Sequence, residues 1–300
     1  MKLAYFHTDG SSRVGVVVED RIFDLSAVAQ AAGISVPDSV LGILAGGAAA
    51  HSAVQRVIDN ATQSLPLSAV TLDPPLQPHD GKLFCLAGNY ASHIQEGGGH
   101  FAGKDKMTPH FFIKPWTTVV ATKQAIRIPA VSTFTDWELE LAVVIGRSGR
   151  DIAVEDAGGY IAGYTIFNDI SARELAYRQD RELQAGDGFF DWLVGKWPDT
   201  FGPMGPWITT ADAVSQPDRL GMKLWLNDAL QQDANTGQMI FSPAEVIAYI
   251  SQFVSLQPGD VISTGTPAGV GHSPEATTQA RRPHRGEIEG WACSKITWTR

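Results

Sequence analysis

Short β-prone segments separated by turn-forming residues dominate the chain from residue 82 onward. Each is a few residues long, rich in branched and aromatic side chains, and bounded by glycine, proline, aspartate or asparagine. They read KLFCLAG, HFFIKP, AIRIP, ELELAVVIG, IAGYTIFND, KLWLND and DVISTGTP. One clear helix is expected, in SPAEVIAYISQFVSLQPGD, with Ser242 as N-cap, Pro243 in the first turn and Glu245 completing a capping box. Short strands with few helices predict an α+β, mostly-β core and argue against a doubly wound sheet.

The first 70 residues have a different character. Two β-prone segments, KLAYF and RVGVVVEDRIFDL, precede a helical stretch over residues 38–61. Four prolines between Leu65 and Gly81 then mark a connector. We therefore predict a small N-terminal α/β domain over residues 1–70 and a catalytic domain over residues 71–300. The polar stretch from Gly271 to Glu287 is expected to be a long surface loop.

The composition excludes several classes of protein. With 23 basic and 32 acidic residues the net charge is −9, which argues against binding to nucleic-acid phosphates but not against a small anionic substrate in a local cationic pocket. Two cysteines, Cys85 and Cys293, without a CxxC pattern argue against a zinc–thiolate site. No signal peptide or membrane-spanning run is recognised, so we expect a cytoplasmic protein that binds neither nucleic acid nor membrane.

The segment TDWELELAVVIG places three carboxylates at alternate positions of an expected strand: Asp136, Glu138 and Glu140. Alternate residues share a face, and like charges on one face repel. Such a pattern alone is typical of a solvated strand face. The apolar continuation LAVVIG instead indicates a buried central strand, where neighbouring carboxylates need a compensating cation. A hard divalent cation such as Mg²⁺ is the natural candidate.

Asp169 is the expected third ligand. It follows the apolar strand YTIFN, where a loop begins. The alternative interpretation is an Asx turn, or the N-cap of a helix in ISARELAYR.

A possible general base lies in GNYASHIQEGGGH. If ASHIQE forms one helical turn, His93 and Glu96 are three residues apart and meet. A carboxylate beside an imidazole fixes its tautomer, which suits a base acting on water, and the glycines that follow would let the segment move as a lid. The alternative is an ordinary surface His–Glu pair beside a flexible loop.

Two further features complete the pattern. Lys196 lies among Trp192, Trp197 and Trp207, where a lysine meets an anion or reaches the surface with its ammonium group. The glycine-rich stretch STGTPAGVG, residues 263–271, offers hydroxyl and backbone N–H groups that could hold a carboxylate, or it is a plain tight turn.

The order of these motifs resembles the fumarylacetoacetate hydrolase family: GNYxxHxxE, WELELAVVIG, NDISARE, GK…DTFGPMGPWI and STGTPAGVG, from about residue 82 to the C-terminus. The resemblance implies a mixed β-roll core, a homodimer, and Mg²⁺ or Mn²⁺ as cofactor. The ligands it implies are Glu138, Glu140 and Asp169. Asp136 matches no ligand.

The same resemblance assigns the remaining site residues. His93 and Glu96 match a catalytic pair on a mobile lid, and Lys196 matches a lysine that faces the substrate oxyanion. The implied substrate contacts are Tyr90, Arg173, Thr264 and Thr266.

The implied function is metal-dependent hydrolysis of a C–C bond in an acylpyruvate or 1,3-diketo acid by a His-activated water, in the catabolism of aromatic compounds. The alternatives are an oxaloacetate decarboxylase or a 2-hydroxy-dienoate isomerase on the same site, and, last, a non-catalytic metal-binding protein. Ala176 stands where several acylpyruvate-cleaving relatives have glutamine, and the lid carries His100, Lys104 and Lys106. These differences concern the substrate rather than the metal.

Overall fold

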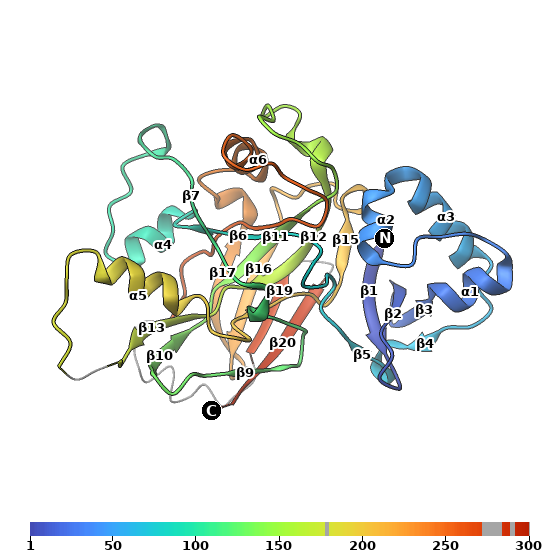
Figure 1. Ribbon diagram of the computed structural model, residues 1–300, viewed down its shortest axis with the longest axis horizontal. Coiled ribbons are helices and arrows are strands. Elements are labelled where there is room, and N and C mark those ends of the chain that lie inside the picture. Colours follow the sequence, from blue (N-terminus) through green and yellow to red (C-terminus); the bar gives the residue numbers. More distant parts are fainter. Residues whose placement is uncertain (178–179, 272–283, 289–291, 300) are drawn as a thin grey trace.

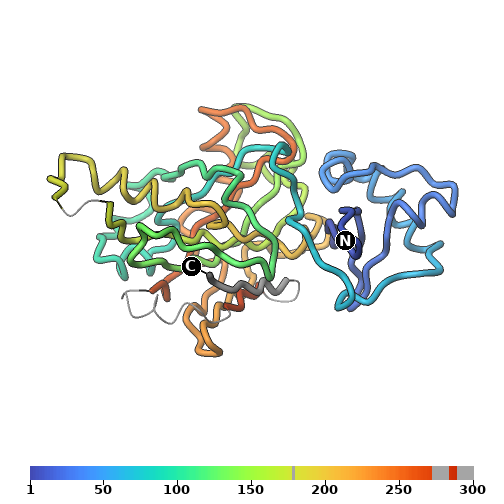
Figure 2. The backbone as a smooth tube through the Cα atoms, turned by 60° about the horizontal axis from the view of Figure 1, so that its bottom comes forward, coloured from blue at the N-terminus to red at the C-terminus, as the bar shows by residue number. Residues whose placement is uncertain are grey.

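The structure of the chain is a computed structural model that describes residues 1–177, 180–271, 284–288 and 292–299. Its first part forms a small α/β unit at one end of the molecule (Figures 1 and 2). The elements of this unit are β1 (Lys2–His7), β2 (Arg13–Val18), β3 (Arg21–Asp24), α1 (Leu25–Ala32), α2 (Val40–Ala45), α3 (Gly47–Asp59), β4 (Leu65–Pro66) and β5 (Thr71–Leu72).

The larger part of the chain is built mostly of strands, as the sequence predicted (Figure 1). Its helices are α4 (Ala91–Glu96), α5 (Asp187–Gly195) and α6 (Pro243–Ser251). Its strands are β6 (Leu83–Ala87), β7 (His110–Ile113), β8 (Val119–Val120), β9 (Ala125–Arg127), β10 (Ser132–Asp136), β11 (Leu139–Ile145), β12 (Ile161–Asn168), β13 (Ser171–Leu175), β14 (Gly202–Pro203), β15 (Ile208–Thr210), β16 (Gly221–Leu226), β17 (Ala229–Asn235), β18 (Val261–Ser263), β19 (His284–Ile288) and β20 (Ala292–Thr299).

Two sheets carry the architecture. In the described part of the chain, a mixed 11-stranded sheet has the order β4-β3-β2-β1-β15-β12-β11-β18-β6-β7, with β5 paired to β1. A five-stranded sheet has the order β17-β16-β19-β20-β9. The N-terminal unit joins the main sheet because β1 pairs with β15, Lys2 opposite Thr209. The division into two domains at residue 70 therefore stays a prediction, and one continuous sheet contains strands of both parts.

Strand β11 is the central element, and all of its residues are buried. Its odd-numbered side chains, such as Leu141 and Val143, join the core that also holds Met222 and Leu224 of the second sheet. Its even-numbered Ala142 and Val144 join a second core, which contains the helices of the N-terminal unit. Glu138 and Glu140 precede these even positions, so burial on both faces of β11 forces the carboxylates into the interior.

Local sequence signals account for several boundaries. Helix α6 begins with the expected capping box, in which Ser242 accepts from the Glu245 N–H and the Glu245 side chain accepts from Ser242. Helix α4 spans the expected ASHIQE turn. Among the described residues, no helix is long and apolar enough to span a membrane.

Two local predictions and one alternative interpretation were wrong. The acidic segment is two strands, because β10 pairs with β13 while β11 pairs with β12, and the chain changes partner between Asp136 and Leu139. The segment after Asp169 is strand β13, so Asp169 caps no helix there. Residues 284–287 belong to strand β19 and not to a loop, and residues 272–283 of that predicted loop lie outside the described residues.

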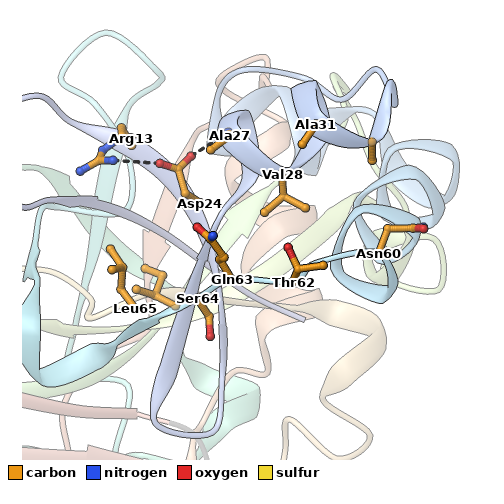
Figure 3. A pocket seen from close by; sticks show the side chains of 12 residues that line it. Arg13, Asp24, Ala27, Val28, Ala31, Asn60, Thr62, Gln63, Ser64 and Leu65 are labelled. Carbon is orange, nitrogen blue, oxygen red and sulfur yellow. Dashed lines mark hydrogen bonds and ion pairs between the residues drawn. The ribbon is translucent and has the colours of Figure 1, made fainter.

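A cavity of about 630 Å³ lies in the N-terminal unit, between α1, the β2–β3 hairpin and residues 60–65 (Figure 3). On its wall, Arg13 binds the Asp24 carboxylate at 3.0 Å, and the other Asp24 oxygen caps α1 at the Ala27 N–H. Arg13 and Asp24 are thus paired with each other, and the described lining contains no carboxylate cluster. This cavity is therefore not the candidate site.

Candidate metal centre and adjoining cavity

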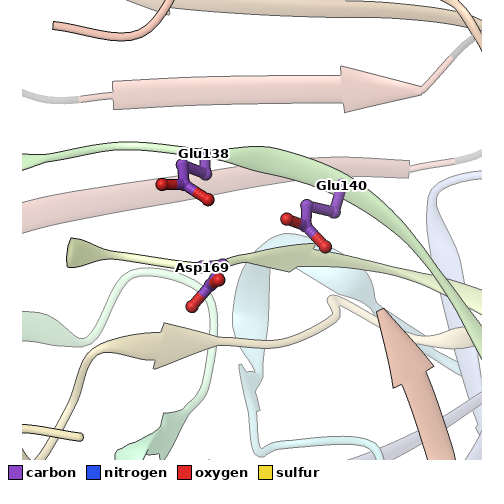
Figure 4. A group of neighbouring side chains, drawn as sticks. All are labelled: Glu138, Glu140 and Asp169. Atoms are coloured by element: carbon purple, nitrogen blue, oxygen red, sulfur yellow. The ribbon is translucent and has the colours of Figure 1, made fainter. Parts of the chain in front are cut away.

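Three buried carboxylates converge at the carboxyl end of β12: those of Glu138, Glu140 and Asp169 (Figure 4). One oxygen from each lies within 4.8 Å of the others. The strand register produces this arrangement, because Leu139 pairs with Asn168 and the Asp169 N–H donates to the Glu138 carbonyl at 2.9 Å. The structure thus brings together the three residues that the sequence singled out as metal ligands.

Lys196 lies between two of these carboxylates. Its Nζ is 2.8 Å from Glu138 Oε2 and 2.7 Å from Asp169 Oδ2, and the lysine is 2% exposed. Burial by itself lowers the pKa of Lys196, but the carboxylates of Asp169 and Glu138 outweigh it and raise that pKa. Lys196 is therefore an ammonium ion inside the site and does not reach the surface.

Arg173 binds Glu138 from the other side. Its Nη2 is 2.5 Å from Glu138 Oε1, and its Nε is 2.9 Å from Asp136 Oδ2. Burial alone would raise the pKa of Glu138, but Lys196 and Arg173 lower it to about 2. Burial raises the pKa of Asp136 to about 6 although Arg173 opposes the shift. Asp136 therefore anchors Arg173 rather than joining the carboxylate triad.

Lys114 was missed by the sequence reasoning. It follows β7 and donates to Asp169 Oδ1 at 2.5 Å, to the Phe201 carbonyl at 2.8 Å and to the Ile170 carbonyl at 3.1 Å. The signal was present in HFFIKP, where a lysine ends an apolar strand directly before a proline. The criterion applied to Lys196, a lysine in apolar surroundings, would have found it.

Glu140 has no cationic partner among the described residues. Its Oε2 accepts from Ser263 Oγ at 2.5 Å and from the Gly265 N–H at 2.8 Å, while its buried Oε1 has no hydrogen-bond partner in the described part of the chain. Gly265 has a φ of +88°, which favours glycine and turns its N–H toward the carboxylate. Burial and the neighbouring carboxylates of Asp169 and Glu138 raise the pKa of Glu140 well above its usual range.

The donor set fits a divalent cation. When all four are ionised, the buried carboxylates in this region of the described structure exceed the three cationic side chains by one negative charge. The carboxylates are those of Asp136, Glu138, Glu140 and Asp169, and the cations are Lys114, Arg173 and Lys196. The potential ligands are all carboxylate oxygens, and one of them, Glu140 Oε1, has no hydrogen-bond partner among the described residues. Such a donor set suits Mg²⁺ or Mn²⁺.

A cavity of about 450 Å³ opens beside this cluster, and Glu138, Arg173, Lys196 and Thr266 line it. His93 of α4 lines the same cavity. His93 Nδ1 lies 3.5 Å from Glu96 Oε2, so the expected pair is formed. Glu96 Oε1 also accepts from the Gly269 N–H at 2.8 Å, which ties α4 to the glycine-rich turn.

Of the other predicted substrate contacts, one lines the cavity and two do not. Thr266 lines the cavity, and its hydroxyl donates to the Leu139 carbonyl at 2.9 Å. Thr264 donates to the Leu141 carbonyl at 2.8 Å, and Tyr90 is buried with its hydroxyl 3.5 Å from Met222 Sδ. Thr264 and Tyr90 are not among the described residues that line the cavity. Both hydroxyls have partners inside the protein, and contact with a substrate stays a prediction for both.

A mixed β-core with a buried carboxylate triad, two lysines and a His–Glu pair defines a class of metal-dependent enzyme. The family model described as fumarylacetoacetate (FAA) hydrolase C-terminal matches residues 82–296. The chain belongs to the fumarylacetoacetate hydrolase family of enzymes, as the sequence motifs predicted.

The chain is similar to relatives that have several different activities. The mitochondrial oxaloacetate tautomerase Fahd2a of Rattus norvegicus is 36% identical over 237 residues, which are 79% of this chain and 71% of that protein. The structure of maleylpyruvate hydrolase from Sphingobium sp. SYK-6 superposes with a TM-score of 0.78 at 32% identity, covering 100% of this chain and 99% of that one. A second structure of that hydrolase contains manganese(II) and pyruvate.

A third relative has another activity. The 2-hydroxyhepta-2,4-diene-1,7-dioate isomerase of Mycobacterium marinum superposes with a TM-score of 0.71 at 28% identity, covering 100% of this chain and 98% of that one. These similarities support a divalent metal and a small organic acid as substrate.

Proposed function

We propose that this enzyme is a divalent-metal-dependent hydrolase that cleaves the C–C bond between the acyl group and the pyruvate unit of an acylpyruvate. The observation that carries the proposal is the His93–Glu96 pair on α4, because His93 lines the same cavity as Lys196 and Glu138 of the carboxylate triad. Proton relocation needs only a base, whereas hydrolysis needs a base with room for water, and the cavity of about 450 Å³ supplies that room.

The ligands would be Glu138, Glu140 and Asp169, and Mg²⁺ or Mn²⁺ is the proposed cofactor. When bound, such a cation supplies positive charge that withdraws electrons from the dicarbonyl unit of the substrate. Arg173 and Lys196 add two cations on the cavity wall, so the site attracts an anionic 2-oxo acid despite the negative charge of the whole chain.

The proposed reaction begins at His93. Glu96 faces Nδ1, so Nε2 is the nitrogen that takes a proton from water. The hydroxide oxygen bonds to the acyl carbonyl carbon, the C–C bond to the methylene carbon breaks, and its electron pair forms the pyruvate enolate. His93 then returns the proton to that methylene carbon, so a carboxylic acid and pyruvate are released.

Lys196 is the proposed partner of the developing enolate oxygen. Two of its three N–H groups bind Glu138 and Asp169 in the described structure, which leaves one for the substrate. A preorganised cation of this kind stabilises charge that develops during the reaction.

The second candidate is keto–enol conversion or decarboxylation of oxaloacetate. The similarity to the rat oxaloacetate tautomerase favours it. Tautomerisation moves a proton between carbon and oxygen and requires no attacking water, so the same triad and His93 would suffice for it. A 2-hydroxy-dienoate isomerase would use the site in the same way.

The test is an assay of purified protein on acetylpyruvate, fumarylpyruvate and oxaloacetate, each with Mg²⁺ and with EDTA. Cleavage of an acylpyruvate that EDTA abolishes supports the proposal. Turnover of oxaloacetate alone overturns it in favour of the second candidate. Assembly as a homodimer and a cytoplasmic location stay predictions.

A further inference from the structure

A second cavity adjoins the first one beneath α4. Its volume is about 320 Å³, and it shares five lining residues with the cavity beside the carboxylates. The shared residues are Leu86, Ala87, Gly88, Ile94 and Gly99. The two cavities are thus neighbours that common side chains separate.

Ile94 is the shared side chain that stands between them. It lies between two glycines that also line both cavities. A Cβ added at Gly99 would be 2.9 Å from Ile94 Cγ2, and one added at Gly88 would be 3.4 Å from Ile94 Cγ1. Leu86, the other large shared residue, is 3% exposed and belongs to the main core. Ile94 is therefore the removable part of the wall.

The inner surface of the second cavity is apolar. Met107, Pro109 and Phe241 line it together with Ile94. Asn89 also lines it, but its side-chain amide is used: Nδ2 donates to the carbonyls of Phe241 and Thr264, and Oδ1 accepts from the Phe241 N–H.

No fixed cation is available to this cavity from the described residues. Lys104, which lies over the Phe241 ring, binds Glu245 at 2.6 Å, and it is not among the described lining residues. His100 and His110 line the cavity but are exposed. The cavity suits an uncharged alkyl group better than a second carboxylate.

We propose that the second cavity is a subsite for the alkyl part of the substrate's acyl group, and that Ile94 limits the length of that group. This inference rests on the proposed function, since it places the pyruvate unit beside the triad. In the native enzyme Ile94 closes the subsite to all but short acyl groups. Truncation at Ile94 joins the two cavities and admits a longer chain.

The first experiment compares acetylpyruvate with hexanoylpyruvate as substrates. Each buried methylene changes binding several-fold, so Ile94→Ala is expected to raise the hexanoyl-to-acetyl ratio of kcat/KM by about 10-fold or more, chiefly through KM. Ile128→Ala, at a partly buried isoleucine outside both cavities, is the matched control.

Two outcomes overturn the inference. One is an unchanged hexanoyl-to-acetyl ratio of kcat/KM in the Ile94→Ala protein, provided that this protein unfolds at the same temperature as the Ile128→Ala protein. The other is an equal gain for fumarylpyruvate, which would mean that the subsite accepts a carboxylate.

A binding experiment separates this inference from the proposed reaction. Pyruvate, 2-oxohexanoate and 2-oxooctanoate contain no bond that the proposed hydrolysis breaks. Their dissociation constants are measured by calorimetry with Mn²⁺ present. Ile94→Ala should bind 2-oxooctanoate about 10-fold more tightly relative to pyruvate. That result supports the subsite even if no acylpyruvate is cleaved, and its absence overturns the subsite even if acetylpyruvate is cleaved.

Discussion

The ammonium group of Lys114 lies 2.5 Å from Asp169 Oδ1, and both side chains are completely buried. The second oxygen of Asp169 binds Lys196 at 2.7 Å, so one carboxylate lies between two lysines. Lys114 also donates to two backbone carbonyls, which leaves it no N–H for a substrate. We therefore infer that Lys114 positions Asp169, while Lys196, which lines the cavity, acts on the substrate.

Replacing Lys114 with methionine should destabilise the protein strongly. The change leaves Asp169 with one cation in place of two, and removal of one partner from a buried ion pair typically costs about 3–5 kcal/mol. The free energy of unfolding, measured by urea titration without metal, should fall by that amount. Lys223→Met is the control, because Lys223 and Asp233 are exposed and 3.8 Å apart, and it should change stability by less than about 0.5 kcal/mol. A loss below about 1 kcal/mol for Lys114→Met would contradict the positioning role.

Replacing Glu140 with alanine should abolish binding of the divalent cation. Glu140 contributes the unpaired buried oxygen Oε1, and no cation among the described residues pairs with it. In the native protein, Mg²⁺ at about 100 times its dissociation constant should raise the free energy of unfolding by about 2.7 kcal/mol. Calorimetric titration and urea unfolding should both show that the Glu140→Ala protein lacks this response. The exposed Glu174 offers a control, since Glu174→Ala should keep the full response.

Replacing His93 with alanine should separate metal binding from hydrolysis. The variant should bind the cation normally, because His93 is not part of the triad, and should lose about 10²–10⁴-fold in kcat for acylpyruvate cleavage. Oxaloacetate decarboxylation, which needs no activated water, would survive if the site supports it. Gln95→Ala, an exposed change on the same helix, should leave both readouts unaltered. Undiminished cleavage by the His93→Ala protein would show that another group is the base.

The two glutamates of the carboxylate triad could be anticipated from the sequence because their placement has a local cause. Alternation along a strand places Glu138 and Glu140 on one face, and the apolar residues that follow signal burial. The turn of α4 fixes the spacing of His93 and Glu96 in the same way, because residues three apart on a helix meet.

The features that the sequence did not reveal depend on contacts between distant segments. The acidic segment divides into two strands because β10 pairs with β13 and β11 pairs with β12, and these pairings involve segments that are distant in the sequence. Lys114 acquires its role from Asp169, 55 positions away, so the apolar segment HFFIKP indicates that the lysine is buried but does not identify its partner. Thr264 stays a predicted substrate contact, and the sequence did not reveal that its hydroxyl donates to the Leu141 carbonyl of the neighbouring strand β11.

Acidic pH should destabilise the protein through His284. This residue begins β19, is 1% exposed, and lies edge-on to the Trp137 ring at a centroid distance of 5.4 Å. Burial lowers its pKa to about 3 from the ordinary value of 6.5, so the folded protein keeps the imidazole neutral while the unfolded chain takes up a proton. The free energy of unfolding should therefore decrease as the pH falls from about 6.5 toward 3, by at most about 4 kcal/mol from this group.

The test is the difference between variant and native protein, because titrating carboxylates also contribute over the same range. Urea unfolding between pH 7.5 and 4 should show that the His284→Leu protein loses less stability than the native protein as the pH falls. The exposed His79 provides the control, and His79→Leu should follow the native curve. Parallel curves for His284→Leu and the native protein would mean that His284 is not the source of the acid sensitivity.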